Sequence, residues 1–269
     1  MLVEFLLIYA AVYGASLVVY FCLGLALSWI NARNPDRRIQ PRRDGAKRRR
    51  EDILSSLKAL AVSAGLLSTG FFAQLQGWTV TPLPHSWWSV ALGFGLCLVI
   101  FDAWFYFGHR LLHHPRFYRF HALHHKAVAP TAWSNDCSTT VDTVIEHGFY
   151  LVVWFVLPVP ALAVFGLRLF DQVTGMIGHA GFEYFASRSS RAPSPMICTT
   201  YHDLHHSQFR YNYGNFFSFW DRWLGTIHPD YDKMVEKMEA GATPGDAAAR
   251  QPKGRPQADM QTGPQSRPA

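Results

Sequence analysis

Residues 108–126 have the sequence GHRLLHHPRFYRFHALHHK and carry six of the thirteen histidines of the chain. A second stretch, residues 201–207, has the sequence YHDLHHS and adds three more. Together they contain HxxxH, HxxHH and, more than seventy residues later, HxxHH again. Residues three and four apart share one face of a helix, so each motif directs its imidazoles toward one point. Since neutral imidazole is the commonest protein ligand of transition metals, the repeated spacing predicts a metal centre.

The number of candidate ligands exceeds what one metal ion needs, because a structural zinc site takes four. We exclude His114, since it precedes Pro115 and is biased away from helical geometry. None of the motifs has the glutamate of an HExxH zinc protease. Nine histidines suit two metal ions. The candidate ligands are His109, His113, His121, His124, His125, His202, His205 and His206 from the motifs, and His179 from the element GHAGFE.

Two carboxylates are candidates for orienting these ligands. Asp102 is the one charged residue in the apolar run 87–107, and it shares a helical stripe with His109 and His113. A carboxylate within a membrane span is costly and usually functional. We expect Asp102 to accept an imidazole N–H, with an interhelical hydrogen bond as the alternative. Glu183, one helical turn after His179, is the second candidate.

Long uncharged runs predict a membrane protein. Residues 5–30 and 59–91 contain no Asp, Glu, Lys or Arg, and about 20 apolar residues suffice to cross a bilayer. We expect an all-α integral membrane bundle with three spans and a short helical hairpin. The expected divisions are 1–52 for the first span and a basic loop, 53–107 for two further spans, 108–232 for the catalytic region and 233–269 for a disordered tail.

The hairpin, residues 148–176, follows from topology. A single crossing here would place the two histidine stretches on opposite sides of the membrane, where they could not share a centre. Pro158 and Pro160 lie near the middle of the segment, where a turn fits. Each arm has about 10–16 residues, which predicts partial penetration of the bilayer. Arg168 and Asp171 on the returning arm are expected to pair.

The positive charge is concentrated between the first two spans. Residues 31–50 carry nine Lys and Arg against two Asp, within a chain of formal net charge +6. The segment has no interleaved aromatic residues and follows a span, so we exclude nucleic acid as its partner. A cytoplasmic loop facing anionic headgroups explains it, and this places the metal site on the cytoplasmic face. The four cysteines show no CxxC spacing and predict no disulfide.

Residues 101–226 resemble the integral-membrane fatty acid hydroxylase/sterol desaturase superfamily of non-haem di-iron oxygenases. The resemblance rests on FDAWFYFGHRLLHHPRFYRFHALHH, GHAGFE and YHDLHHSQFRYNYGNFFSFWDRWLGT. It implies two non-haem iron ions held by the nine histidines. It further implies an oxidoreductase that uses O2 to attack a C–H bond of a lipid in the bilayer. Electrons would come from a separate donor, either cytochrome b5-like or a ferredoxin with its reductase.

One region departs from this family. Many relatives carry a His-Pro-x-x-Glu element after the first HxxHH, where this chain has SNDCSTTVDTVIEH at 134–147. We expect this region to border the substrate entrance, so the substrate stays open. The substrate tail is expected near Trp104 and Phe107. Since no fused cytochrome b5-like domain is present, the electron donor is expected to be another protein.

Two other functions compete with the oxygenase. One is a histidine-rich membrane zinc hydrolase acting on a lipid, which would need neither O2 nor a reductant. The other is a non-enzymatic metal-binding or transport protein, which would need polar residues through its spans, whereas these spans are almost entirely apolar. Hydroxylation and desaturation share the same metal chemistry, so the ligand motifs leave both open.

Overall fold

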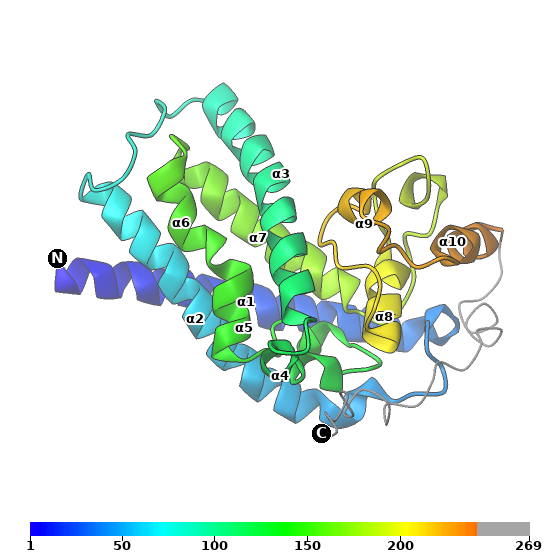
Figure 1. Cartoon of the computed structure of the whole chain (residues 1–269). Coiled ribbons are helices and arrows are strands. Elements are labelled where there is room, and N and C mark those ends of the chain that lie inside the picture. Colours follow the sequence, from blue (N-terminus) through cyan, green and yellow to red (C-terminus); the bar gives the residue numbers. More distant parts are fainter. Residues whose placement is uncertain (241–269) are drawn as a thin grey trace, which may run out of the picture.

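The computed structural model describes residues 1–240, and these form an all-helical protein (Figure 1). Within this range the only β pairing is two isolated bridges. The helices are α1 (Leu2–Arg33), α2 (Arg49–Leu75), α3 (Trp87–Leu112), α4 (Tyr118–His121), α5 (Thr140–His147), α6 (Phe149–Val156), α7 (Ala161–Gly178), α8 (Thr199–Gln208), α9 (Phe219–Trp223) and α10 (Tyr231–Glu239). The predicted fold class is confirmed. All four cysteines are free, as expected.

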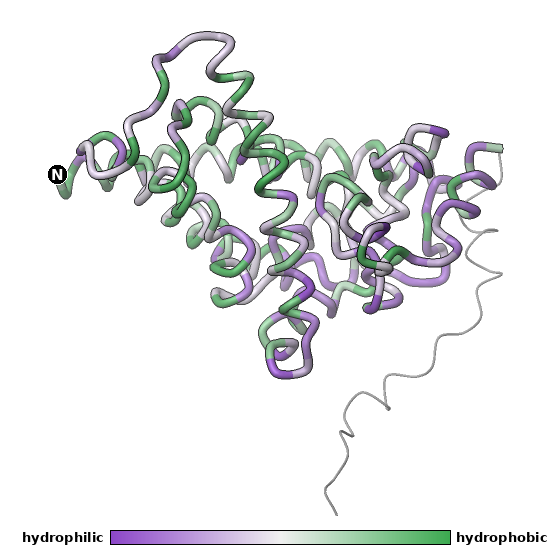
Figure 2. The backbone as a smooth tube through the Cα atoms, turned by 45° about the horizontal axis from the view of Figure 1, so that its top comes forward, coloured by the Kyte–Doolittle hydropathy of each residue, from purple (hydrophilic) through white to green (hydrophobic). Residues whose placement is uncertain are grey.

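Four helices are long and apolar enough to cross a membrane. They span Leu2–Arg33, Gly45–Leu75, Trp87–Leu112 and Ala161–Gly178. The N-terminus lies at the end of this bundle farthest from the short helices α8 to α10 (Figure 1). Hydrophobic residues dominate the long helices, whereas hydrophilic residues gather toward the end of the molecule opposite the N-terminus (Figure 2). The chain is therefore a membrane protein with a polar region at one end of its bundle.

Local sequence sets the limits of α3, the helix that leads into the first histidine stretch. Ser86 caps its first turn by accepting the backbone N–H of Ser89. The helix ends at Leu112, three residues before Pro115. The chain then turns back through α4, which brings the HxxHH motif under the end of α3.

The hairpin exists, and its outgoing arm begins earlier than expected. Its tip contacts the turn between α2 and α3, where the backbone N–H of Val80 donates to Trp154 O and that of Leu83 donates to Pro158 O. The outgoing arm begins before the predicted residue 148, because α5 and α6 together extend it over residues 140–156. These seventeen residues, sixteen of them helical, span about 25 Å. The depth to which the hairpin enters the bilayer stays a prediction. The returning helix α7 is itself one of the four membrane-length helices.

The predicted tail also needs correction. Lys233–Glu239 belong to α10, not to a disordered segment. This helix is amphipathic, and its buried Met234 and Val235 pack against Leu204 of α8. The rest of the prediction, residues 241–269, lies outside the described residues.

The core between α2, α3, α6 and α7 depends on a close approach at Gly70. Trp154 is fully buried there and donates its indole N–H to Tyr150 O at 2.7 Å. A Cβ added at Gly70 would lie 2.1 Å from Trp154 Cδ1. The rigid ring cannot move without disturbing its neighbours, so overpacking of this kind destabilises the fold.

We therefore expect Gly70→Ala to lower the free energy of unfolding by about 1–3 kcal/mol. The measurement is thermal unfolding of the detergent-purified protein. Gly14→Ala on α1 is the matched control, because a Cβ added at Gly14 has no neighbouring atom within 4 Å. Alanine favours a helix over glycine, so the control keeps or raises the midpoint. Equal midpoints for the two variants would contradict the prediction.

Candidate metal centre

The nine predicted histidines lie together and divide into two groups. Within each group the ligand atoms all lie within 4.8 Å of one another. The five-histidine group consists of His109, His113, His121, His125 and His205, and the four-histidine group of His124, His179, His202 and His206. His114 lies outside both groups. The nine candidate ligands therefore form two adjoining groups rather than one crowded cluster.

Several elements far apart in the sequence supply these side chains. The end of α3 provides His109 and His113, and the turns that follow it provide the first HxxHH motif. The end of α7 provides His179, and α8 provides the second HxxHH motif. On α8 the adjacent His205 and His206 enter different groups, because neighbouring helical residues point about 100° apart.

The Nδ1 atoms of four histidines contact acceptors outside the groups. His109 Nδ1 lies 3.0 Å from Tyr213 O, His205 Nδ1 lies 2.7 Å from Tyr211 O, and His179 Nδ1 lies 2.8 Å from Gly175 O. The fourth, His121 Nδ1, lies 3.0 Å from Asp142 Oδ2. A carbonyl or carboxylate oxygen only accepts, so Nδ1 carries the proton in each ring. This tautomer leaves the Nε2 lone pair free for a metal.

The Nε2 atoms face the interior of each group. Those of His109 and His121 are 3.1 Å apart, and those of His202 and His206 are 3.0 Å apart. Adjacent ligands of an octahedron with metal–nitrogen bonds of about 2.1 Å are separated by about 3.0 Å. Two unprotonated Nε2 atoms cannot form a hydrogen bond with each other, because both are acceptors. Their converging lone pairs can instead bind a cation. The arrangement fits transition-metal ions.

Burial keeps these rings neutral. It lowers the pKa of His113 to about 3, with a smaller contribution from His124. It lowers the pKa of His124 to about 4 and that of His179 to about 3. At neutral pH each ring therefore has a lone pair available for coordination.

Asp102 does not act as expected. It is buried, and its Oδ1 accepts the backbone N–H groups of Phe216 at 2.8 Å and Phe217 at 3.3 Å instead of an imidazole N–H. The prediction failed because Asp102 lies two helical turns from His109, about 10 Å along the axis. Its role is to hold the segment after α8 against α3.

Glu183 also contacts no imidazole among residues 1–240. Its Oε2 accepts the backbone N–H of Thr200 at 2.7 Å together with the Thr200 hydroxyl, and its Oε1 accepts the N–H of Phe185. Thr200 lies in the first turn of α8, where backbone N–H groups lack helical partners. Glu183 therefore fixes the start of the helix that carries three of the histidines.

Asp142 is a partner of the candidate ligand His121, and this role was not predicted from the sequence. The residue is fully buried on α5, and it is the carboxylate that contacts His121. It belongs to the segment 134–147 that departs from the family pattern. The spacing of Asp142 and Glu146, four residues apart, was visible in the sequence, but nothing there indicated the burial of Asp142 or its partner.

We expect Asp142→Ala to weaken metal binding by about 10–100-fold, because loss of a ligand's outer partner frees its tautomer and orientation. Competition with a chelator on the purified protein measures this. Asp142→Asn keeps an acceptor oxygen for His121 Nδ1, so its affinity should lie between those of the wild type and Asp142→Ala. Equal affinity in all three proteins would show that His121 needs no partner.

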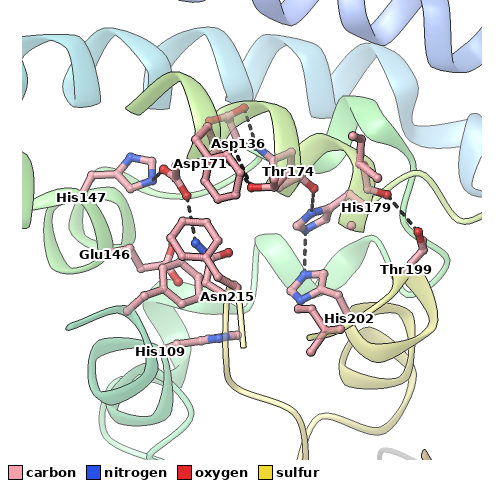
Figure 3. A pocket seen from close by; sticks show the side chains of 18 of the residues that line it. His109, Asp136, Glu146, His147, Asp171, Thr174, His179, Thr199, His202 and Asn215 are labelled. Atoms are coloured by element: carbon pink, nitrogen blue, oxygen red, sulfur yellow. Dashed lines mark hydrogen bonds and ion pairs between the residues drawn. The ribbon is translucent and has the colours of Figure 1, made fainter. Parts of the chain in front are cut away.

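A cavity of about 450 Å³ adjoins both histidine groups (Figure 3). Its apolar lining includes Leu98 and Phe105 on α3, Phe170 on α7, and Phe217. Histidines of both groups line it as well: His109, His124, His179 and His202. Such a volume accommodates a sizeable organic ligand.

The cavity lies elsewhere than expected. Trp104 and Phe107 do not line it. The Trp104 indole donates to Ile145 O at 2.8 Å, and Phe107 packs on Trp220 with ring centroids 5.6 Å apart. The cavity instead follows the face of α3 that carries Phe105, and not the residues near which the substrate tail was expected.

Comparisons with known proteins identify related sequences. Residues 94–226 match the sequence model of the family described as fatty acid hydroxylase. A Delta(7)-sterol 5(6)-desaturase of Gibberella zeae is 30% identical over 195 residues, which are 70% of this chain and 54% of that protein. Methylsterol monooxygenase 1 of Gallus gallus is 35% identical over 155 residues, 54% of this chain and 51% of that protein. The chain thus spans about half the length of these relatives. No solved structure matches it significantly.

Proposed function

Because the chain belongs to the fatty acid hydroxylase/sterol desaturase superfamily, we propose that it is a membrane-bound oxygenase. It uses O2 and external electrons to hydroxylate or desaturate a C–H bond of a lipid. One observation carries the proposal: nine neutral imidazoles form two groups beside a largely apolar cavity in a bundle of membrane-length helices.

We assign one iron ion to each group, with five and four histidine ligands. Bound non-haem iron supplies the activation of O2 that an unactivated C–H bond requires. The protein's own residues hold that centre in place. Asp142 and three backbone carbonyls fix the imidazole tautomers, Glu183 fixes the start of α8, and the aromatic lining of the cavity excludes water.

A lipid can reach the cavity from the side of α7. Three apolar side chains line the cavity and are also exposed at the protein surface: Phe170 on this helix, and Phe185 and Met196 after its end. Exposed apolar side chains on a membrane-spanning helix face lipid. We propose that the substrate enters laterally from the bilayer between these side chains.

We place the metal centre on the cytoplasmic face. The basic segment after α1 lies against the histidine helix, since Gln40 Nε2 donates to Asp203 Oδ1 at 2.8 Å. Loops rich in Lys and Arg stay in the cytoplasm. There a separate electron donor, cytochrome b5-like or a ferredoxin with its reductase, delivers the electrons.

The test is metal analysis of the detergent-purified protein, followed by turnover of a lipid panel with O2 and a reductase system. We expect about two irons per chain and lipid products that require both O2 and reductant. Zinc alone would call for reconstitution with iron before turnover is measured. Lipid hydrolysis without O2 would favour a zinc hydrolase, and an iron-loaded protein that oxidises no lipid in the panel would count against the oxygenase.

A further inference from the structure

One side of the cavity is strongly polar. Glu146 and His147 at the end of α5, Asp171 on α7, and Asn215 gather there, while His179 and His202 lie at the other side (Figure 3). A cavity that only received hydrocarbon would not need such groups, because burying polar side chains without partners is costly. The polar side therefore calls for an explanation.

Most of these polar groups satisfy one another. Asp171 accepts hydrogen bonds from the Tyr150 hydroxyl at 3.0 Å and from Asn215 at 2.9 Å. It also pairs with Arg168 at 3.5 Å, as predicted from the sequence, and lies 3.7 Å from His147 Nε2. This network ties α6 and α7 to the segment after α8, so the groups that form it have a structural role.

Two groups are the exceptions: His147 Nδ1, which is buried without a hydrogen-bond partner among residues 1–240, and the carboxylate of Glu146. The Glu146 side chain is half-buried and lines the cavity, yet no residue among 1–240 donates a hydrogen bond to its carboxylate. A half-buried carboxyl group of this kind loses part of its hydration without gaining a partner from the protein. Its hydrogen-bond partner is therefore whatever fills the cavity, either water or a ligand.

A third metal ion does not explain Glu146. A carboxylate oxygen of Glu146 lies within 4.8 Å of ligand atoms of His121 and Asp142. Both nitrogens of His121 are already engaged, however, since Nδ1 contacts Asp142 and Nε2 faces His109. Asp142 and Glu146 alone are too few ligands for an ion, so Glu146 is left to face the cavity.

We propose that Glu146 is the subsite for an oxygen function of the lipid, and that the attacked C–H bond lies within a few carbon atoms of that oxygen. A hydroxyl group can donate to Glu146 or accept from it, so the substrate class is an alcohol-bearing lipid. The short distance from Glu146 to the five-histidine group sets the spacing between the oxygen and the reacting carbon. This inference rests on the proposed function for its reaction but not for its binding step.

The test measures binding without O2 or reductant, in metal-loaded protein reconstituted in nanodiscs. The probes are two matched pairs: a sterol and its deoxy analogue, and octadecanol and octadecane. Displacement of a tritiated alcohol gives the affinities. One hydrogen bond to a half-buried carboxyl group predicts that the wild type prefers the alcohol of at least one pair by about 10–100-fold.

Glu146→Leu should reduce this preference to about twofold or less, while Glu146→Gln, which keeps hydrogen-bonding atoms, should retain most of it. Glu236→Leu, an exposed position on α10, should leave it unchanged. Equal metal content and unfolding midpoints show that each variant is folded. An unchanged preference in Glu146→Leu, or a wild type that binds neither alcohol, would overturn the inference.

Turnover separates this inference from the proposed function. A preference that depends on Glu146 in a protein that never oxidises lipid would sustain the subsite and reject the oxygenase. If a product forms, its new hydroxyl or double bond should lie within about four carbons of the original oxygen. A product modified far from that oxygen would overturn the inference and leave the oxygenase intact.

Discussion

The double substitution His124→Ala, His206→Ala is expected to lower the metal content from about two ions per chain to about one. Both residues belong to the four-histidine group, so only two imidazoles remain there. Two ligands do not hold a transition metal against solvent and chelators, since structural and catalytic sites use three or four. The five-histidine group keeps all its ligands and its ion. Lipid oxidation should fall by more than about 100-fold, because removing ligands costs more than removing a ligand's partner.

A second double substitution, His113→Ala with His205→Ala, makes the comparison sharper. It removes two ligands of five and leaves three, so this group should weaken its metal rather than lose it. The matched control is His85→Ala with His114→Ala, since neither residue belongs to a group. Metal analysis before and after chelator dialysis measures all three proteins. Two ions retained in His124→Ala, His206→Ala would reject the assignment, provided that its unfolding midpoint shows a folded protein.

The sequence predicted the ligands because their geometry is local. A spacing of three or four residues on a helix brings side chains to one face regardless of what surrounds the helix. The hairpin was also predicted correctly, since two histidine stretches that form one centre must lie at the same end of the bundle. Its outgoing arm begins earlier than predicted, because α5 and α6 continue this arm across His147 and Gly148.

The partners of the ligands could not be predicted, because tertiary packing selects them. Three of the four Nδ1 acceptors described above are backbone carbonyls, at Tyr213, Tyr211 and Gly175. Every residue has a carbonyl, so no residue type marks this role. The fourth acceptor is Asp142 on another helix, to which the sequence assigned no role, whereas Asp102 on the ligand helix was expected to accept an imidazole N–H. The helical rise alone excludes Asp102, since sharing a stripe does not bring residues seven positions apart into contact.

Asp221 shows how much of the centre depends on residues that never face a metal. It is fully buried on α9. Its Oδ1 accepts the backbone N–H of Tyr213 at 2.9 Å and the Thr226 hydroxyl at 2.7 Å. Its Oδ2 accepts the N–H of Gly214 at 2.8 Å and the Tyr201 hydroxyl. One carboxylate thus joins α8, α9 and the segment whose Tyr213 carbonyl fixes His109.

We therefore expect Asp221→Ala to lower the free energy of unfolding by about 3–5 kcal/mol, because four buried donors lose their acceptor at once. Thermal unfolding in detergent measures this, with the exposed Asp230→Ala as control. Asp221→Asn should fall between them, since its amide keeps one acceptor oxygen but turns N–H groups toward other donors. Where Asp221→Asn still folds, its five-histidine group should lose metal to a chelator before its four-histidine group does, because His109 is held through Tyr213. A midpoint for Asp221→Ala equal to that of Asp230→Ala would show that these hydrogen bonds do not hold the segment in place.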